Sequence, residues 1–260
     1  MNAQKSADSS VKMVNPYSAP ALEKGLDILE VLCQSETGLT HKEIARRLGR
    51  SVSELYRMLN CLVRRNYVAN YNDTYSITTK LFQLSQVHPP THRLLTEAMP
   101  ILQELSRQVS FSCDLRVYNK GAQTVIASMQ TPTGIGFATR VGSEIEVAPS
   151  ASGRVLVAFQ DPETLELRIR ESLPDKSAAE IQAFGQDVHT VAVKGFASIQ
   201  SNQYAGVYAI AFPILDINRH AVAALTVPML ARIDGVKQPT RSEVEEALRA
   251  STARLSSRIG

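Results

Sequence analysis

Apolar positions near the start of the chain recur at steps of three and four residues, which is the spacing of amphipathic helices. Four leucines in the segment ALEKGLDILEVLC predict one helix over residues 21–33. The stretch His41–Val68 predicts two further short helices, the second with an apolar stripe that contains Leu55, Leu59 and Leu62. The chain is therefore expected to open with a group of three helices.

Polar residues at fixed positions mark the ends of the two short helices. Thr40-x-x-Glu43 and Ser51-x-x-Glu54 both have capping-box spacing, in which a hydroxyl accepts from an orphan amide and a carboxylate reaches back to the cap amide. Gly49 stands between the boxes, where helices commonly end in a left-handed residue. A helix, a short glycine-containing turn and a second helix are the sequence outline of a helix-turn-helix.

Two short strands are expected directly after this pair, at about Tyr67–Tyr71 and Thr74–Ile77. Asn72-Asp73 would join them, and such residues suit tight hairpin turns. A hairpin in this place is the wing of a winged helix-turn-helix, which lies near the phosphate backbone of DNA. An ordinary solvent-exposed turn is the alternative.

The hydrophobic pattern changes again near Ser112. Before it, a short helix is expected over Lys80–Gln86 and a longer one over residues 92–109, with a kink or restart at Pro100. After it, strands are expected in the segments SCDLRVYN, TVIASMQ and FATRV.

The remaining pattern predicts an α+β domain. Helices are expected over residues 150–160, 161–172 and 177–193, the last opened by the capping box Ser177-x-x-Glu180. Strands are expected over residues 196–200, 207–214 and 221–227, and a further box, Thr240-x-x-Glu243, begins a C-terminal helix. Strands, helices, strands and a helix in this order predict an α+β fold with an antiparallel sheet.

Positive charge is concentrated near the start of the chain, although the net formal charge is only +3. Residues 1–85 carry 11 Lys and Arg against 8 Asp and Glu, whereas the rest of the chain carries 17 of each. Between His41 and Val68 there are seven basic and two acidic residues, and both acidic ones belong to capping boxes. This surplus favours phosphate contact and predicts binding to double-stranded DNA. A solvated helical pair in an all-α domain is the alternative.

The candidate DNA contacts lie on the outer face of the second helix and among the basic residues around it. Arg57 can take guanine bidentately, Asn60 can take adenine, and Ser53 or Tyr56 suits phosphate. A solvated Arg57, or one paired with a nearby glutamate, is the alternative. Ser51 can meet phosphate, but a capping role explains it more readily. The other candidates are Lys42, Arg46, Arg47, Arg64, Arg65 and Thr74.

Composition argues against a membrane protein or a disulfide scaffold. Hydrophobic content is 44%, which is normal for a soluble globular protein, and no apolar run is long enough to span a membrane. Three widely spaced cysteines indicate a reducing cytoplasm. Of these, Cys33 and Cys61 are expected to be small buried side chains in helices.

Motifs for catalysis and for cofactors are incomplete. The five histidines show no metal spacing. The segment Ser150-Ala-Ser-Gly lacks the frame of a nucleophile elbow, and Gly134-x-Gly136 lacks the third glycine of a dinucleotide site. No cofactor, metal ion or catalytic residue is therefore expected.

From about Ala21 to Gly260 the chain resembles the IclR-type transcriptional regulators. The segments that carry the likeness, in this order and spacing, are ALEKGLDILEVL, LYRMLNCL, ASGRVLVAF, Gly195-Phe196-Ala197 and AIAFPILD. The resemblance implies a winged-helix DNA-binding domain, a linker helix and a GAF-like effector-binding domain. It also implies a homodimer or homotetramer on operator half-sites, and RNA polymerase as a partner if the protein is an activator.

The resemblance further implies that a small organic acid binds in a pocket of the C-terminal domain. The matching positions are Ala151, Ser152 and Gly153 at a helix start, and Ile199, Ala209, Thr226 and Pro228 on later strands. Amides at the helix start could hold a carboxylate. Relatives often carry polar side chains on those strands, whereas this chain is mostly apolar there, which favours an acid with an aromatic or otherwise bulky body. Asp114 could hydrogen-bond an effector hydroxyl or lie exposed at a strand edge.

The expected organisation is a disordered tail (1–18), a winged helix-turn-helix domain (19–85), a linker helix (86–109) and an effector-binding domain (110–260). The expected function is that of a cytoplasmic, DNA-binding regulator of a catabolic pathway, controlled by a bulky organic acid. The alternatives are a repressor that responds to a small aliphatic acid, an enzyme that uses the C-terminal domain, and an architectural DNA-binding protein.

Overall fold

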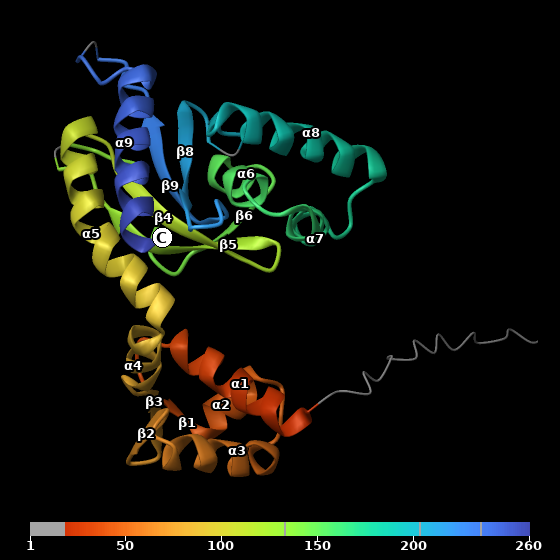
Figure 1. The fold of residues 1–260 in the computed structure, drawn as a ribbon. Helices are drawn as coiled ribbons and strands as arrows, with labels where there is room; N and C mark the ends of the chain where they lie inside the picture. Colours follow the sequence, from red (N-terminus) through yellow and green to blue (C-terminus); the bar gives the residue numbers. More distant parts are fainter. Residues whose placement is uncertain (1–18, 133, 203, 235) are drawn as a thin grey trace, which may run out of the picture. The chain divides into compact units, whose positions relative to one another are not determined.

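The computed structural model describes residues 19–260, except 133, 203 and 235 (Figure 1). The tail expected over residues 1–18 lies outside the described residues. The chain divides into two compact units, and the boundary falls between His88 and Pro89. Each unit has a hydrophobic core of its own.

The first unit combines helices with a small antiparallel sheet. Its helices are α1 (Pro20–Cys33), α2 (His41–Arg47), α3 (Val52–Arg64) and α4 (Lys80–Val87). Its strands are β1 (Leu39–Thr40), β2 (Val68–Tyr71) and β3 (Thr74–Ile77), in the sheet order β1-β3-β2. The apolar faces of α1, α2 and α3 meet in a core that contains Ile28, Ile44 and Leu55, none of which is exposed.

Both expected capping boxes of the first unit are present. The Thr40 hydroxyl accepts from the amide of Glu43 at 3.3 Å, and the Glu43 carboxylate accepts from the amide of Thr40 at 2.8 Å. Ser51 and Glu54 make the same pair of bonds at the start of α3. Gly49 has φ +62°, so the turn between the two helices uses the left-handed conformation that glycine adopts without steric cost.

The hairpin β2–β3 is also confirmed. Its turn residues Asn72 and Asp73 have φ of 50° and 60°, and positive φ at both central positions is typical of two-residue hairpin turns. The sequence did not predict β1, which is only two residues long and pairs with β3 through Leu39 and Tyr75.

The second unit is built on a six-stranded antiparallel sheet, which confirms the α+β prediction (Figure 1). The strands are β4 (Cys113–Asn119), β5 (Ala122–Met129), β6 (Glu144–Glu146), β7 (Ala197–Gln200), β8 (Val207–Leu215) and β9 (Ala221–Leu230). Their spatial order is β6-β5-β4-β9-β8-β7. The helices are α5 (Pro89–Val109), α6 (Ala151–Ala158), α7 (Pro162–Ser172), α8 (Ala178–Lys194) and α9 (Arg241–Ile259).

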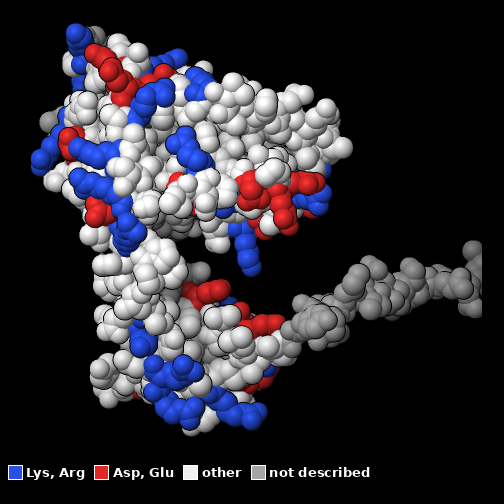
Figure 2. All heavy atoms as spheres, in the orientation of Figure 1, with Lys and Arg blue, Asp and Glu red and all other residues white. Residues whose placement is uncertain are grey.

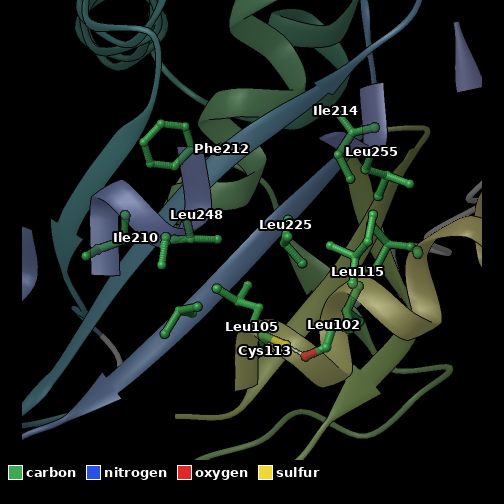
Figure 3. Close-up of a cluster of buried hydrophobic side chains, with 14 of the residues drawn as sticks. Leu102, Leu105, Cys113, Leu115, Ile210, Phe212, Ile214, Leu225, Leu248 and Leu255 are labelled. Atoms are coloured by element: carbon green, nitrogen blue, oxygen red, sulfur yellow. Dashed lines mark hydrogen bonds between the residues drawn. The ribbon is translucent and has the colours of Figure 1, made fainter. Parts of the chain in front are cut away.

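Helices cover both faces of this sheet, and each face has its own apolar cluster. On one face α5 and α9 pack against the central strands, with Leu102, Leu225 and Leu248 fully buried among them (Figure 3). On the other face α6 and α8 enclose a second cluster around Leu156 and Val188. Successive side chains along a strand point to opposite faces of the sheet, so each strand contributes to both apolar clusters. Neither face of the sheet is simply exposed to solvent.

The helix α5 belongs to the second unit. Pro100 lies inside it without ending it. The helix shares the apolar cluster with α9, and the ion pairs Arg254–Glu104 (2.6 Å) and Arg258–Glu97 (3.0 Å) connect the exposed sides of the two helices. The expected segment 86–109 therefore contains the end of α4 and a helix that is packed on the six-stranded sheet.

Two local predictions are wrong. Residues 137–141, expected as a strand in FATRV, have no regular structure, and the edge strand β6 begins three residues later, at Glu144. Cys33 is exposed, because it occupies the last position of α1 on the side away from the core. Cys113 is buried instead, and its thiol donates to the carbonyl oxygen of Leu102 at 3.3 Å. Burial raises the pKa of this thiol to about 12, so it stays protonated.

Candidate functional site

The outer face of α3 is exposed in the first unit. The side chains that were predicted to lie on it are all exposed, namely Ser53, Tyr56, Arg57 and Asn60. Leu55 and Leu59 are on the opposite face and are at most 1% exposed. The helical period therefore separates a core-facing stripe from a row of polar side chains that can enter a groove.

Basic side chains surround this row, and Figure 2 shows them gathered along the α3 side of the first unit. The acidic side chains nearby are occupied: Glu54 pairs with Lys24 at 3.2 Å and Asp27 pairs with Arg50 at 3.4 Å. Within the described part of the chain, the remaining basic candidates have no ion pair, and all are exposed: Lys42, Arg46, Arg47, Arg57, Arg64 and Arg65. These charges are available to phosphates.

Ser51 and Thr74 hold structural positions. The Ser51 hydroxyl accepts from the Glu54 amide and donates to the Glu54 carboxylate at 2.9 Å. These bonds from the Ser51 amide and hydroxyl, together with the ammonium of Lys24, lower the pKa of Glu54 to about 2. Thr74 is half-buried in β3, where it pairs with Thr40 and Tyr71.

Three rings connect α2, α3 and the hairpin. His41, the first residue of α2, is only 8% exposed and is stacked on Tyr56, with 26° between the ring planes and 6.0 Å between ring centroids. Its other neighbour is Tyr75 of β3, with 6.1 Å between centroids in an edge-on arrangement. The ring of His41 therefore supports one face of the Tyr56 ring, while Tyr56 itself remains 56% exposed.

The second unit contains a cavity of about 550 Å³ above one face of the sheet. Strands β4, β8 and β9 contribute Arg116, Ala209 and Thr226 to its lining, and Ala151 contributes the start of α6. The irregular segment 137–143, the edge strand β6 and the loop residues Ser201 and Tyr204 complete the wall. A volume in this range suits a small organic ligand.

Five of the eight predicted effector residues line the cavity: Ala151, Ile199, Ala209, Thr226 and Pro228. Their positions on neighbouring strands explain this, because Ala209 lies opposite Ile199 on β7 and opposite Pro228 on β9. The other three, Asp114, Ser152 and Gly153, are not in the lining.

Those three residues lie outside the lining of the cavity, and two of them contact the lining residue Arg116. Asp114 is completely buried in a central strand, so a position at an exposed strand edge is wrong. Its carboxylate accepts from Arg116 at 2.9 Å and from the Ser128 hydroxyl at 2.8 Å. The Ser152 hydroxyl accepts from Arg116 at 3.0 Å. Gly153 allows close approach, since a Cβ atom there would lie 2.1 Å from the Val147 carbonyl oxygen.

These contacts position Arg116, which was not predicted from the sequence. Its side chain is 8% exposed and donates to Asp114, Ser152 and Thr139. Its Nε is buried and has no partner among the described residues, and the same holds for the hydroxyl oxygen of Thr226, which lies opposite Asp114 on the neighbouring strand β9. Buried polar atoms normally have partners, so these two mark a place where a polar ligand group fits.

The start of α6 adds donors to the same place. The Ser150 hydroxyl caps the helix by accepting from the Gly153 amide at 3.0 Å. The amides of Ala151 and Ser152 precede the first intrahelical bond, and the positive end of the helix dipole lies there. The guanidinium and the helix start together favour a carboxylate over a cation.

Two aromatic residues that line the cavity were also not predicted from the sequence. Phe137 and Tyr204 come from different irregular segments, and their rings meet edge-on with 5.1 Å between centroids. No periodic pattern marks loop residues of this kind. Arg116 did leave a signal, because an arginine two residues after an aspartate shares its face on an otherwise apolar strand, and a buried arginine needs such a partner.

Other kinds of site find little support in the described ranges. No group of three or more His, Cys, Asp or Glu side chains there could hold a metal ion. None of the described helices combines the length and the apolar character needed to cross a bilayer.

Both units match profiles of one protein family. Residues 21–70 match the profile described as the IclR helix-turn-helix domain, and residues 90–257 match the C-terminal domain of bacterial IclR transcriptional regulators. The regulator BhcR of Paracoccus denitrificans is 26% identical over 88% of this chain and 85% of its own length. The Pca regulon regulatory protein of Pseudomonas putida is 23% identical over 89% of this chain and 80% of its own length.

Solved structures agree on the fold. HmgR of Pseudomonas aeruginosa has a TM-score of 0.70 at 25% identity and covers 93% of this chain and 100% of its own. An IclR homologue from Microbacterium hydrocarbonoxydans, complexed with 4-hydroxybenzoate, has a TM-score of 0.75 at 19% identity and covers 92% of this chain and 98% of its own. Because the two family profiles together span nearly all of the described chain, this protein belongs to the IclR family of DNA-binding transcriptional regulators.

Proposed function

We propose that the protein controls transcription of a catabolic pathway in response to an organic acid with an aromatic or otherwise bulky body. The acid binds in the cavity of the second unit, and its binding changes the affinity of the first unit for an operator or the protein's contact with RNA polymerase. The single observation that carries the proposal is the buried Nε of Arg116, which has no partner among the described residues, in a guanidinium whose Nη1 donates to Ser152 near the start of α6 at 3.0 Å.

The cavity supports a bulky acid in both size and lining. A two- or three-carbon acid would leave most of the 550 Å³ unfilled. Ile199, Ala209 and Pro228 give the same cavity an apolar wall, and a ligand body placed against it removes apolar surface from water. The relative complexed with 4-hydroxybenzoate supports an aromatic acid as the kind of ligand that this fold accepts.

On the DNA side, α3 acts as the recognition helix. Arg57 and Asn60 reach base edges, Ser53 and Tyr56 contact phosphate or sugar, and the surrounding basic residues neutralise the backbone. Operator half-sites require two recognition helices, so the protein acts as a homodimer or homotetramer. The helix α5, which follows the first unit in sequence and packs on the sensor sheet, carries the change between the units.

A titration of operator binding tests the proposal. Fluorescence anisotropy with a duplex from the protein's own promoter region, at fixed low salt, is repeated with aromatic and aliphatic acids. An aromatic acid is expected to shift the operator affinity. Ala209→Phe fills the cavity wall and is expected to weaken that response without weakening DNA binding in the absence of acid. An undiminished response in this variant, at the same acid concentration, places the effector elsewhere.

The same titration separates the alternatives. A response to short aliphatic acids alone contradicts a bulky effector. No response to any acid, with normal operator binding, indicates a DNA-binding protein whose second unit is structural.

A further inference from the structure

We propose that His41 is a positioning residue for DNA binding, because its ring sets the orientation of Tyr56 on the exposed face of α3. This inference rests on the proposed function, in which Tyr56 contacts the phosphate or sugar of the operator. It adds to that function a buried side chain that does not itself reach the DNA.

The support for Tyr56 begins in the small sheet of the first unit. Tyr75 lies on β3, the central strand, which pairs with β1 through Leu39 and with β2 through Asn70. Tyr75 is only 6% exposed. A ring on a strand that is paired on both sides, and with so little exposed surface, has a fixed position.

His41 connects this fixed ring to α3. Its imidazole meets Tyr75 edge-on, with 64° between the ring planes, and is stacked on Tyr56 with 26° between the planes. The centroid distances of 6.1 Å and 6.0 Å lie in the range in which aromatic rings attract each other. His41 belongs to α2 and Tyr56 to α3, so the stacked pair forms only when the two helices are packed together.

Tyr56 gains from this contact because most of its surface is not packed. The residue is 56% exposed on the face that is proposed to enter the groove. A side chain that is free before binding loses conformational freedom when it contacts DNA, and this loss weakens binding. A ring that is already held against His41 loses less, so the operator affinity is higher.

The flat face of the imidazole, rather than its Nε2 atom, makes the contact with Tyr56. Nε2 is buried and has no partner in the part of the chain that the structure describes. A buried polar atom without a partner lowers the stability of the folded state. Phenylalanine at position 41 would keep a flat ring and remove this atom, whereas alanine would remove the ring itself.

Operator binding by the full-length protein tests the inference. Fluorescence anisotropy gives the Kd for a duplex from the protein's own promoter region, at one low salt concentration and well below the unfolding midpoint of each variant. His41→Ala is expected to weaken binding roughly threefold to tenfold, as for the loss of one aromatic contact, whereas His41→Phe should stay within about twofold of the parent protein. The control Ile44→Val shortens a fully buried side chain of the same helix and should leave the affinity unchanged.

Two results of this titration overturn the inference. If His41→Ala binds the operator as tightly as the parent protein while Tyr56→Ala binds it more weakly, the proposed function stands and the positioning role does not. If His41→Phe loses as much affinity as His41→Ala, the nitrogen atoms matter and the flat ring does not.

A double-mutant cycle separates positioning of Tyr56 from general support of α2. His41→Ala is repeated in a Tyr56→Ala background, where no further loss of affinity is expected because the side chain that His41 positions is gone. An equal loss in both backgrounds would mean that His41 only maintains helix packing, and the inference fails. If Tyr56→Ala alone leaves operator binding unchanged, Tyr56 does not contact DNA, and this part of the proposed function fails together with the inference.

Discussion

Asp114 and Arg116, two residues apart on β4, form a buried ion pair in which Nη2 and Oδ2 are 2.9 Å apart. Residues at this spacing point to the same face of a strand, so the pair can form without any change in the backbone. The carboxylate has no exposed surface and the arginine side chain is 8% exposed. The aspartate therefore fixes the position of the guanidinium that lines the cavity.

Asp114→Asn is expected to destabilise the second unit by about 3 kcal/mol, because it leaves the buried charge of Arg116 without a counter-ion. Urea unfolding followed by circular dichroism measures the change. The control is Glu104→Gln, which breaks the exposed pair with Arg254 and should cost no more than about 0.5 kcal/mol. Similar costs for the two variants would mean that the buried pair is no more important than the exposed one.

Thr226→Val should stabilise the ligand-free protein by about 1 kcal/mol, because it replaces a buried hydroxyl that has no partner in the described part of the chain. The same change should weaken binding of the acid. Thr252→Val is the matched control, since its buried hydroxyl donates to the Leu248 carbonyl oxygen at 2.9 Å and its loss should cost about 1 kcal/mol. Thermal unfolding with and without the acid gives both quantities. A loss of stability in the first variant would show that Thr226 is already satisfied.

Gly153→Ala should be severely destabilising, whereas Gly185→Ala should not. At position 153 a Cβ atom would lie 2.1 Å from the carbonyl oxygen of Val147, and backbone atoms cannot easily move away. At position 185, inside α8, nothing lies within 4 Å, so alanine should add about 0.5–1 kcal/mol of stability through its helix propensity. The midpoint of thermal unfolding compares the two, and equal midpoints would refute the close approach of α6 to Val147.

Arg57→Glu is expected to weaken operator binding by at least about 1–3 kcal/mol, through loss of a base contact and added repulsion from phosphates. Anisotropy titrations at one salt concentration measure it, and circular dichroism checks the fold. Arg107→Glu makes the same change of charge at an exposed position of α5 and should have a much smaller effect. If the two variants bind alike, α3 is not the recognition helix.

The capping box of α3 predicts an acid-sensitive helix start. The pKa of Glu54 is lowered from 4.5 to about 2 by the bonds from Ser51 and by Lys24. A lowered pKa in the folded state means that this stabilisation is present above pH 4.5 and is lost as the pH falls toward 2. Carboxyl NMR titration measures the midpoint directly. Ser51→Ala removes the hydroxyl bond but keeps the backbone amide, so it should move the midpoint part of the way back toward 4.5, whereas Ser53→Ala should not move it. An unchanged midpoint in the first variant would disprove the contribution of the Ser51 hydroxyl.

Local chemistry determined much of this fold from the sequence. The four capping boxes, at Thr40, Ser51, Ser177 and Thr240, are all formed. They could be recognised because their partners lie three residues apart, and the hairpin turn at Asn72-Asp73 depends only on its own backbone. The stripe through Leu55 and Leu59 likewise fixed which face of α3 is exposed. The resemblance to family segments extended the prediction to the second unit, including five residues that line its cavity.

Only the tertiary structure decided which polar groups meet at the cavity wall and behind it. Arg116 and Ser152 are 36 residues apart in sequence, and their hydrogen bond exists because β4 and α6 are packed together. Phe137 and Tyr204 meet from two irregular segments, which have no period to reveal them. Asp114 was predicted as a possible ligand contact because the sequence shows its charge. The sequence does not show that Arg116 is its hydrogen-bond partner. Charge and period are properties of neighbouring residues, whereas burial and pairing depend on the whole sheet. The sequence therefore indicated which face of α3 is exposed, and only the tertiary structure brought Arg116, Asp114 and Ser152 together.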